Sequence, residues 1–209
     1  SPQNKADILD QEENIVRKLD AFVKTKVFAA STYSKDLENL DKVLVKKVSN
    51  DTGILKLYIA LLRALKIKHE IVLTCNRKET KFDKKFEAHN FLKDFLIYFP
   101  KTKLYLSPNE VNTRLGYPSA YNTDTYGLFI KEVIIGSFKS AVGKVKYIKP
   151  IKSEKTFDRM LIDVKFNEDD LSENLIQLDR SLYGYYAMYI QPFIDLIKGE
   201  KKNELIDEF

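Results

Sequence analysis

The sequence predicts an α+β protein whose helices come first and whose antiparallel sheet follows. Before residue 66, apolar residues recur at helical spacing, and from residue 68 onward the spacing changes to that of strands. A polar turn at residues 100–103 separates two strand-like segments, as in an antiparallel hairpin. We expect two domains: a core at residues 5–130, and a small β-rich extension closed by a C-terminal helix at residues 131–199.

Three helices are expected in the core. The first covers about residues 6–26 and the second residues 35–48, each with apolar residues on one face. The third has the clearest pattern, a wide apolar stripe made of Ile54, Leu57, Tyr58, Leu61, Leu62 and Leu65. Asn50, Asp51 or Thr52 can cap this helix by accepting a hydrogen bond from a backbone N–H group of its first turn.

Strands follow the third helix. Residues 68–75 contain the run Ile71-Val72-Leu73 and are expected to be buried on both faces. Residues 94–99 and 104–106 flank the polar turn and form the hairpin. A loop rich in Pro, Gly, Asn and Tyr covers residues 107–125, and loops of this length tend to be functional or to wrap over the surface.

The extension has a different pattern. Three of its segments are strand-like: residues 133–135, 143–148 and 158–166. In the last of these, apolar and charged residues alternate, which predicts one buried and one solvated face. Residues 175–197 are expected to be mainly helical, with a kink or a restart at Pro192, because proline has no N–H group to donate.

Composition excludes several classes of protein. Hydrophobic residues make up 44% of the chain and charged residues 31%, which is typical of a globular protein. No apolar run approaches the roughly 20 residues that span a bilayer. The net charge is +5, but the lysines are scattered among acidic residues, so we expect no nucleic-acid partner. The single cysteine, Cys75, and two histidines far apart predict no disulfide, no metal and no cofactor.

The order of these segments resembles the transglutaminase-like superfamily. The resemblance lies in a polar turn, the helix GILKLYIALLRALKI, the strand HEIVLT, the hairpin FLIYFPKTKLYLSP and a loop containing GYP. It covers the predicted core and is closest to bacterial multi-domain proteins of unknown function, in which a β-rich extension follows. The resemblance implies a papain-like core, with N-terminal helices packed on an antiparallel sheet.

The resemblance also implies that the catalytic triad is missing. Active members use a cysteine at the start of the long helix, a histidine on the hairpin and an aspartate that orients the histidine. The corresponding positions hold Asp51, Asp94 and Ser107, and none matches the active pattern. We therefore expect a pseudoenzyme: a scaffold or binding module of a larger bacterial envelope protein, in the periplasm or at the cell surface. Its partner would be a protein or peptide, including other domains of the parent chain.

The former substrate cleft is expected to persist as a polar groove between the long helix and the hairpin. The residues assigned to it are Asp51, Asp94, Ser107, Tyr117 and Tyr121. The tyrosines around this loop and those at residues 183–189 fit either packing between the two parts or an aromatic recognition surface.

One enzymatic alternative stays open. Cys75 and His89 would form a non-standard pair in a cysteine hydrolase or acyltransferase, with Asp83 or Asp94 orienting the imidazole. This alternative requires an accessible thiol of low pKa.

Overall fold

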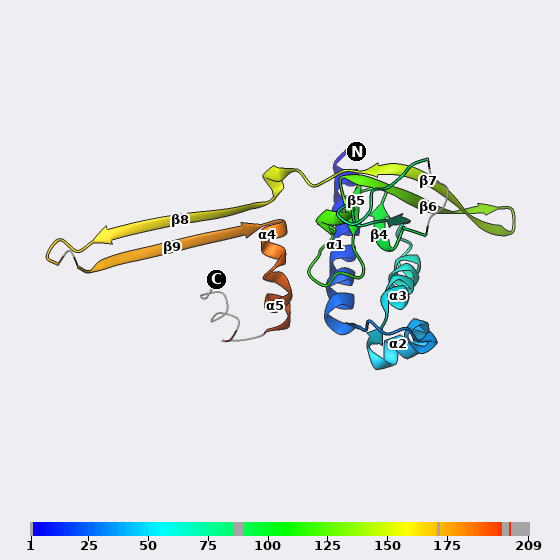
Figure 1. The fold of residues 1–209 in the computed structure, drawn as a ribbon, viewed down its shortest axis with the longest axis horizontal. Helices are drawn as coiled ribbons and strands as arrows, with labels where there is room; N and C mark the ends of the chain where they lie inside the picture. Colours follow the sequence, from blue (N-terminus) through cyan, green and yellow to red (C-terminus); the bar gives the residue numbers. More distant parts are fainter. Residues whose placement is uncertain (1, 86–89, 171, 198–200, 202–209) are drawn as a thin grey trace. The chain divides into compact units, whose positions relative to one another are not determined.

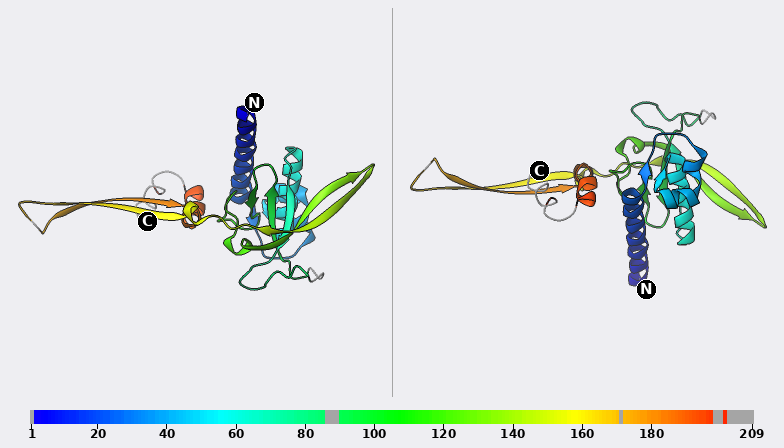
Figure 2. Two further views of the ribbon diagram at one scale, coloured as in Figure 1. Left: turned by 90° about the horizontal axis from the view of Figure 1, so that it is seen from above. Right: turned by 90° about the horizontal axis from the view of Figure 1, so that it is seen from below.

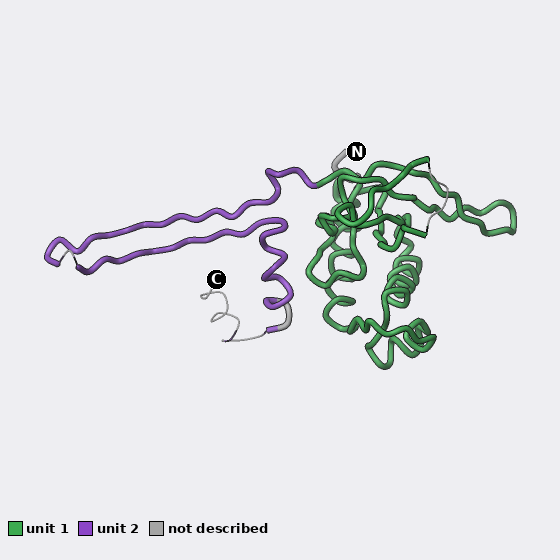
Figure 3. The backbone as a smooth tube through the Cα atoms, in the orientation of Figure 1, with its two compact units in different colours: residues 1–150 green, residues 151–209 purple. Residues whose placement is uncertain are grey.

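The computed structural model describes residues 2–85, 90–170, 172–197 and 201 (Figure 1). The chain divides into two units, residues 1–150 and residues 151–209, coloured green and purple in Figure 3. Unit 1 contains long helices and an antiparallel sheet, which confirms the α+β class. The predicted domain boundary, at residue 131, lies inside strand β6 (Thr125–Ile135). Because β6 pairs with β7 (Phe138–Ile148) along its whole length, both strands belong to unit 1.

The N-terminal helices are α1 (Pro2–Lys26), α2 (Leu40–Lys46) and α3 (Asp51–Ala64). The single helix predicted at residues 35–48 is wrong, because the 3-10 helix η1 (Lys35–Glu38) precedes α2 and Asn39 separates them. Asn39 has an extended backbone, and its side chain accepts a hydrogen bond of 3.1 Å from the Lys42 N–H group. An asparagine side chain that bonds the backbone in this way begins a new helix instead of continuing an old one.

The start of α3 is held tightly against its neighbours. Of the three predicted caps, Asn50 is the one that caps the helix, because its Oδ1 accepts a hydrogen bond of 2.9 Å from the Gly53 N–H group. A Cβ atom at Gly53 would lie 2.1 Å from the Leu37 carbonyl oxygen and 2.2 Å from Ser49 Oγ. Only glycine fits there, so α3 begins in contact with η1 and with β2 (Val48–Ser49), which pairs in parallel with β1 (Phe28–Ala29).

The sheet of unit 1 has five antiparallel strands in the order β5-β4-β3-β6-β7. Strands β3 (Glu70–Thr74), β4 (Asp94–Phe99) and β5 (Leu104–Leu106) confirm the predicted strand and hairpin. The strands predicted at residues 133–135 and 143–148 are parts of the longer β6 and β7. Figure 2 shows that the hairpin end of β6 and β7 extends beyond the helices.

Apolar clusters cover both faces of this sheet. The main core joins α1 and α3 to one face, and its fully buried side chains include Val16, Tyr58, Leu62, Ile97 and Leu106. A smaller cluster on the opposite face consists of Val72, Leu96, Phe129 and Ile148, with Tyr98 and Tyr105 packed against it. The long loop at residues 107–124 connects β5 to β6 and contributes Leu115 to the main core.

Unit 2 contains a two-stranded antiparallel ribbon, β8 (Phe157–Phe166) and β9 (Asn174–Tyr183), followed by the short helices α4 (Tyr185–Met188) and α5 (Gln191–Leu196). The helix predicted from residue 175 is therefore wrong over its first nine residues. Apolar residues there fit two periods, since Leu175, Leu178 and Leu182 have helical spacing whereas Ile176, Leu178 and Leu182 have strand spacing. Because residues 174–183 pair with β8, they form a strand. Pro192 stands in the first turn of α5, which confirms the predicted restart.

Candidate functional site

The three positions predicted to correspond to the family's triad have different surroundings. Asp51 is the exposed first residue of α3 and lies beside η1 and β2. Asp94 begins β4, and its Oδ2 accepts a hydrogen bond of 2.8 Å from the Asn122 side chain. Ser107 directly follows β5 and is 3% exposed, and its Oγ accepts a hydrogen bond of 2.9 Å from the Ser119 N–H group. Residues of the loop thus hold Asp94 and Ser107, whereas Asp51 has other neighbours.

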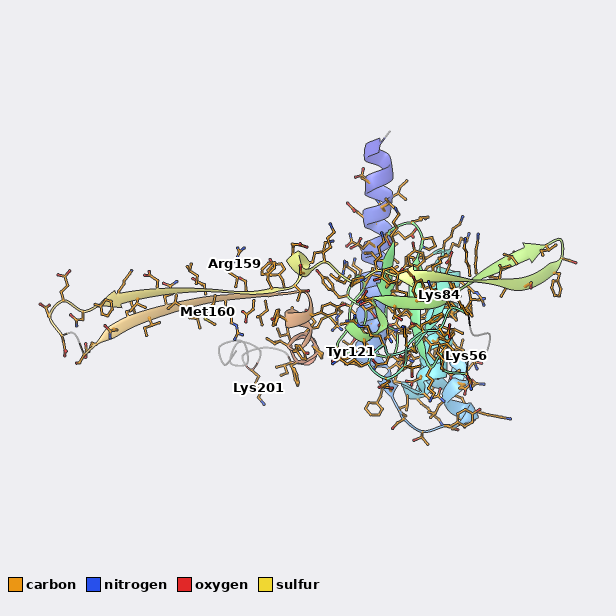
Figure 4. All side chains as sticks on the ribbon, turned by 45° about the horizontal axis from the view of Figure 1, so that its top comes forward. Lys56, Lys84, Tyr121, Arg159, Met160 and Lys201 are labelled. Atoms are coloured by element: carbon orange, nitrogen blue, oxygen red, sulfur yellow. The ribbon has the colours of Figure 1, made fainter. Side chains whose placement is uncertain are left out.

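The two tyrosines of the predicted groove lie in the same loop but in different surroundings. Tyr117 is half-buried, and its N–H group donates a hydrogen bond of 2.8 Å to the Arg114 carbonyl. Tyr121, labelled in Figure 4, is 44% exposed, and the Lys78 ammonium lies 4.5 Å from its ring centroid. The Tyr121 ring therefore lies on the surface of the loop.

A cavity of about 380 Å³ opens where β3 ends and β4 begins. Its described lining includes Cys75, Asn76, Glu79, Thr80, Lys93 and Asp94. Of the five residues predicted to border a groove, Asp94 alone is among the residues that line this cavity. Ser107 is instead covered by the loop, because Ser119 is bonded directly to it.

Cys75 is a buried thiol with a hydrogen-bonded proton. It is 3% exposed, and its Sγ donates to the Thr80 carbonyl oxygen over 3.2 Å. Burial raises the pKa of the Cys75 thiol, and the Asp94 carboxylate raises it further. Both effects favour the neutral thiol, which is a poor nucleophile.

The histidines do not supply a base for Cys75 among the described residues. His89 lies outside the described residues, so its pairing with Cys75 stays a prediction. His69 precedes Cys75 by six residues on the same extended segment, a separation of about 20 Å at the rise of a β-strand. Its Nδ1 lies 2.9 Å from the Ile67 carbonyl oxygen. Asp83, the proposed orienting residue, accepts a hydrogen bond of 2.8 Å from the Lys85 N–H group.

A buried polar cluster that the sequence reasoning missed joins the long loop to two helices. Asp20 and Lys24 of α1 are 1% and 3% exposed at their side chains, and Lys24 Nζ lies 3.0 Å from Asp20 Oδ1. Lys24 Nζ also donates to the Thr113 carbonyl oxygen over 2.8 Å and to Thr113 Oγ1 over 3.0 Å. The Tyr58 hydroxyl of α3 donates to Asp20 Oδ1 over 2.7 Å. The cluster therefore fixes the loop against α1 and α3.

Burial governs the ionisation of this cluster. It lowers the pKa of Lys24, an effect that the Asp20 carboxylate opposes. Burial and the same carboxylate raise the pKa of the Tyr58 hydroxyl, which keeps it a donor. Burial also raises the pKa of Glu110, a loop residue. One signal in the sequence was available: Asp20 falls among Val16, Leu19 and Val23 on the apolar face of α1, where a charge needs a buried partner.

The ribbon of unit 2 carries the second candidate site, which we call the apolar ribbon face. It is one side of β8 and β9, and its apolar members are Met160, Ile162, Val164, Phe166, Ile176, Leu178 and Leu182. Ile162 lies opposite Leu178, and Val164 opposite Ile176. The prediction that this side of β8 is buried is wrong, because Met160, Ile162, Val164 and Phe166 are 41% to 67% exposed.

The opposite side of the ribbon is mixed: six polar residues share it with Phe157, Leu161, Leu175 and Tyr183. Arg159, Asp163 and Lys165 alternate with the apolar residues of β8, and neighbouring residues of a strand point to opposite faces. Figure 4 labels one such pair, Arg159 and Met160. On the apolar side, Asp158 and Arg180 form a salt bridge of 2.7 Å at the end near α4. The predicted alternation is therefore present, but its apolar side is exposed.

Comparison with known proteins gives no relative for this chain. No family model, no curated protein and no solved structure matches it. None of the helices within the described residues is long and apolar enough to cross a bilayer. Over the same residues, no group of three or more His, Cys, Asp or Glu side chains is placed to hold a metal ion.

Proposed function

We propose that this protein is a non-catalytic protein-binding module with a degenerate transglutaminase-like core, acting as a scaffold in a larger bacterial envelope protein. The observation that carries the binding role is the apolar ribbon face. Large aliphatic side chains lie in register on both of its strands and are about half exposed. Contiguous exposed apolar surface of this kind marks interaction sites.

The energetics of the ribbon favour a bound partner. Each strand has ten residues, so the face is about 33 Å long and, with two strands, about 10 Å wide. Seven of the ten residues on this face are apolar, so covering roughly 230 Å² of apolar surface at about 25 cal/mol per Å² is worth about 6 kcal/mol before the cost of association. A two-stranded ribbon alone is marginally stable in water.

The partner that fits this face is another β-sheet with an apolar side. Sheets stack face to face at about 10 Å, with side chains from the two inner faces interdigitating. The β-branched and aliphatic side chains of the ribbon suit such packing. By the resemblance, a domain of the parent protein in the periplasm or at the cell surface would supply that sheet.

The non-catalytic part of the proposal rests on two residues. The family's nucleophile position holds Asp51, whose carboxylate cannot act as the thiolate of that chemistry. Cys75, the single cysteine, is buried and its thiol is bonded to Thr80. A cysteine enzyme needs an accessible thiolate, and this geometry opposes both accessibility and ionisation.

The binding role is tested by photo-crosslinking in the cells that produce the protein. Benzoyl-phenylalanine replaces Ile162 on the apolar ribbon face or Asp163 on the opposite side of β8. We expect a discrete protein adduct from position 162 alone, and its loss when Ile176→Asp places a charge on the apolar ribbon face. Equal adducts from both positions, or none from either, would contradict the proposal.

A further inference from the structure

A second cavity, of about 320 Å³, lies in unit 1 between α3 and the projecting part of the β6–β7 hairpin. Its floor is apolar: Ile59 comes from α3, Ile71 from β3 and Ile130 from β6. Ile71 and Ile130 are direct neighbours across the two strands, and all three side chains are half-buried. The floor therefore continues the apolar surface of the core toward solvent.

Charged and polar groups border this floor. Arg63 of α3, Lys139 of β7 and His69 line the cavity, together with one acidic residue, Glu132 of β6. With His69 neutral, the two cations and one carboxylate give the lining a net charge of +1. Polar groups that converge on an apolar concave surface are typical of small-molecule sites.

The ion pair with Glu132 leaves Arg63 able to bind a ligand. Arg63 Nη2 lies 3.0 Å from Glu132 Oε2, and the two side chains are 61% and 45% exposed. An ion pair so exposed contributes between about 0 and 1 kcal/mol, so a ligand can replace it. Arginine has five N–H donors, and this bond occupies one of them.

A hydrogen bond fixes the His69 imidazole at the rim of the cavity. Its Nδ1 lies 2.9 Å from the Ile67 carbonyl oxygen. A carbonyl oxygen only accepts hydrogen bonds, so Nδ1 carries the hydrogen in this contact and fixes the imidazole. The other ring nitrogen, Nε2, can then accept a hydrogen bond.

We infer that this cavity binds a small aliphatic carboxylate. The carboxylate would sit at Arg63 and Lys139, and its alkyl chain would cover Ile59, Ile71 and Ile130. The cavity is at the lower end of the range of small-molecule sites, about 300–1,000 Å³, which limits the ligand to a short chain. Arg63 lies in the last turn of α3, where the helix end carries partial negative charge, so a single carboxylate suits the site better than a dianion.

Octanoate is the probe, titrated into the ¹⁵N-labelled protein and followed by amide chemical shifts. We expect saturable shifts at Arg63, Ile71 and Ile130. Arg63→Gln should weaken binding about tenfold, the value of one charge-assisted hydrogen bond. Glu132→Gln should strengthen it, because the competing carboxylate is gone.

Lys139 has a matched control in Lys131. Lys139 and Glu132 lie on the same side of the β6–β7 ribbon, whereas Lys131 points to the other side. Lys139→Gln and Lys131→Gln remove the same charge, and only the first should weaken octanoate binding. Octan-1-ol, which lacks the carboxylate, should bind more weakly than octanoate.

Two results would overturn the inference. One is the lack of saturable shifts at the cavity up to the solubility limit of octanoate. The other is equal weakening by Lys139→Gln and Lys131→Gln, which would indicate a general charge effect. Since the site is built from unit 1 alone, either result leaves the proposal about the apolar ribbon face untouched.

Discussion

Replacing Lys24 by methionine tests whether the buried ion pair holds the long loop in place. Methionine keeps most of the aliphatic stem but removes the ammonium, which lies 3.0 Å from Asp20 Oδ1 and 2.8 Å from the Thr113 carbonyl oxygen. The substitution leaves the Asp20 carboxylate buried with the Tyr58 hydroxyl as its donor. Asp20 Oδ2 has no hydrogen-bond partner among the described residues even before the change.

The expected loss is large. Removing one partner of a buried pair costs about 3–5 kcal/mol, because the other charge stays buried and uncompensated. A typical domain has about 5–15 kcal/mol of stability in total. With a urea m-value of about 2 kcal/mol per M, the midpoint of unfolding should fall by about 2 M. Circular dichroism during urea unfolding measures that midpoint directly.

Two further variants make this result interpretable. Lys42→Met removes a lysine from a shorter pair with Asp36, 2.7 Å apart, whose side chains are 47% and 55% exposed, and it should leave the urea midpoint almost unchanged. Adding Asp20→Asn to Lys24→Met removes the uncompensated charge and should restore part of the loss. If Lys24→Met costs no more than Lys42→Met, the buried pair does not stabilise the fold as argued.

Three other predictions follow from the same structure. Gly53→Ala should destabilise unit 1 by about 1–3 kcal/mol in urea unfolding, because its Cβ would meet the Leu37 carbonyl and Ser49 Oγ; an unchanged midpoint would show that the start of α3 can move. Iodoacetamide at neutral pH should modify Cys75 far more slowly in the folded protein than in urea, as followed by mass spectrometry, and fast modification without urea would reopen the enzymatic alternative. Burial raises the pKa of Glu110 above its ordinary 4.5, so the folded state binds the proton more tightly and stability should fall as pH rises from 4.5 to that raised pKa. Glu110→Gln should flatten this dependence in urea midpoints taken from pH 4 upward, and an unaltered slope would assign it to other groups.

The elements that the sequence predicted well are those whose signal is local. Helix α3 combines an apolar stripe with an asparagine cap, and the β4–β5 hairpin combines two apolar runs with a polar turn, so the strand bounds at residues 94–99 and 104–106 agree with the structure. Both signals lie within about fifteen residues of chain. No distant contact is needed to interpret them.

The features that escaped prediction depend on distant partners or on competing local bonds. Asn39 ends one helical segment and caps the next, which a count of apolar spacing does not detect. Strand β9 has apolar residues that fit a helix equally well, and its pairing with β8 decides the matter. The Asp20–Lys24 pair looks like an ordinary pair of helix charges four residues apart, and its burial depends on Tyr58 and on a loop some ninety residues away.

The apolar ribbon face argues for a partner more strongly than exposure alone does. The alternation in β8 and the apolar residues of β9 arise in separate stretches of sequence, and the register brings them to the same side. Seven of the ten residues on this side are apolar, including the pairs Ile162–Leu178 and Val164–Ile176, against four of ten on the other side. A ribbon exposed equally on both sides would have no physical reason for this asymmetry. Cross-strand apolar pairs stabilise a sheet chiefly when that side is buried. This asymmetry supports the proposal that a second sheet packs against the ribbon and covers this face.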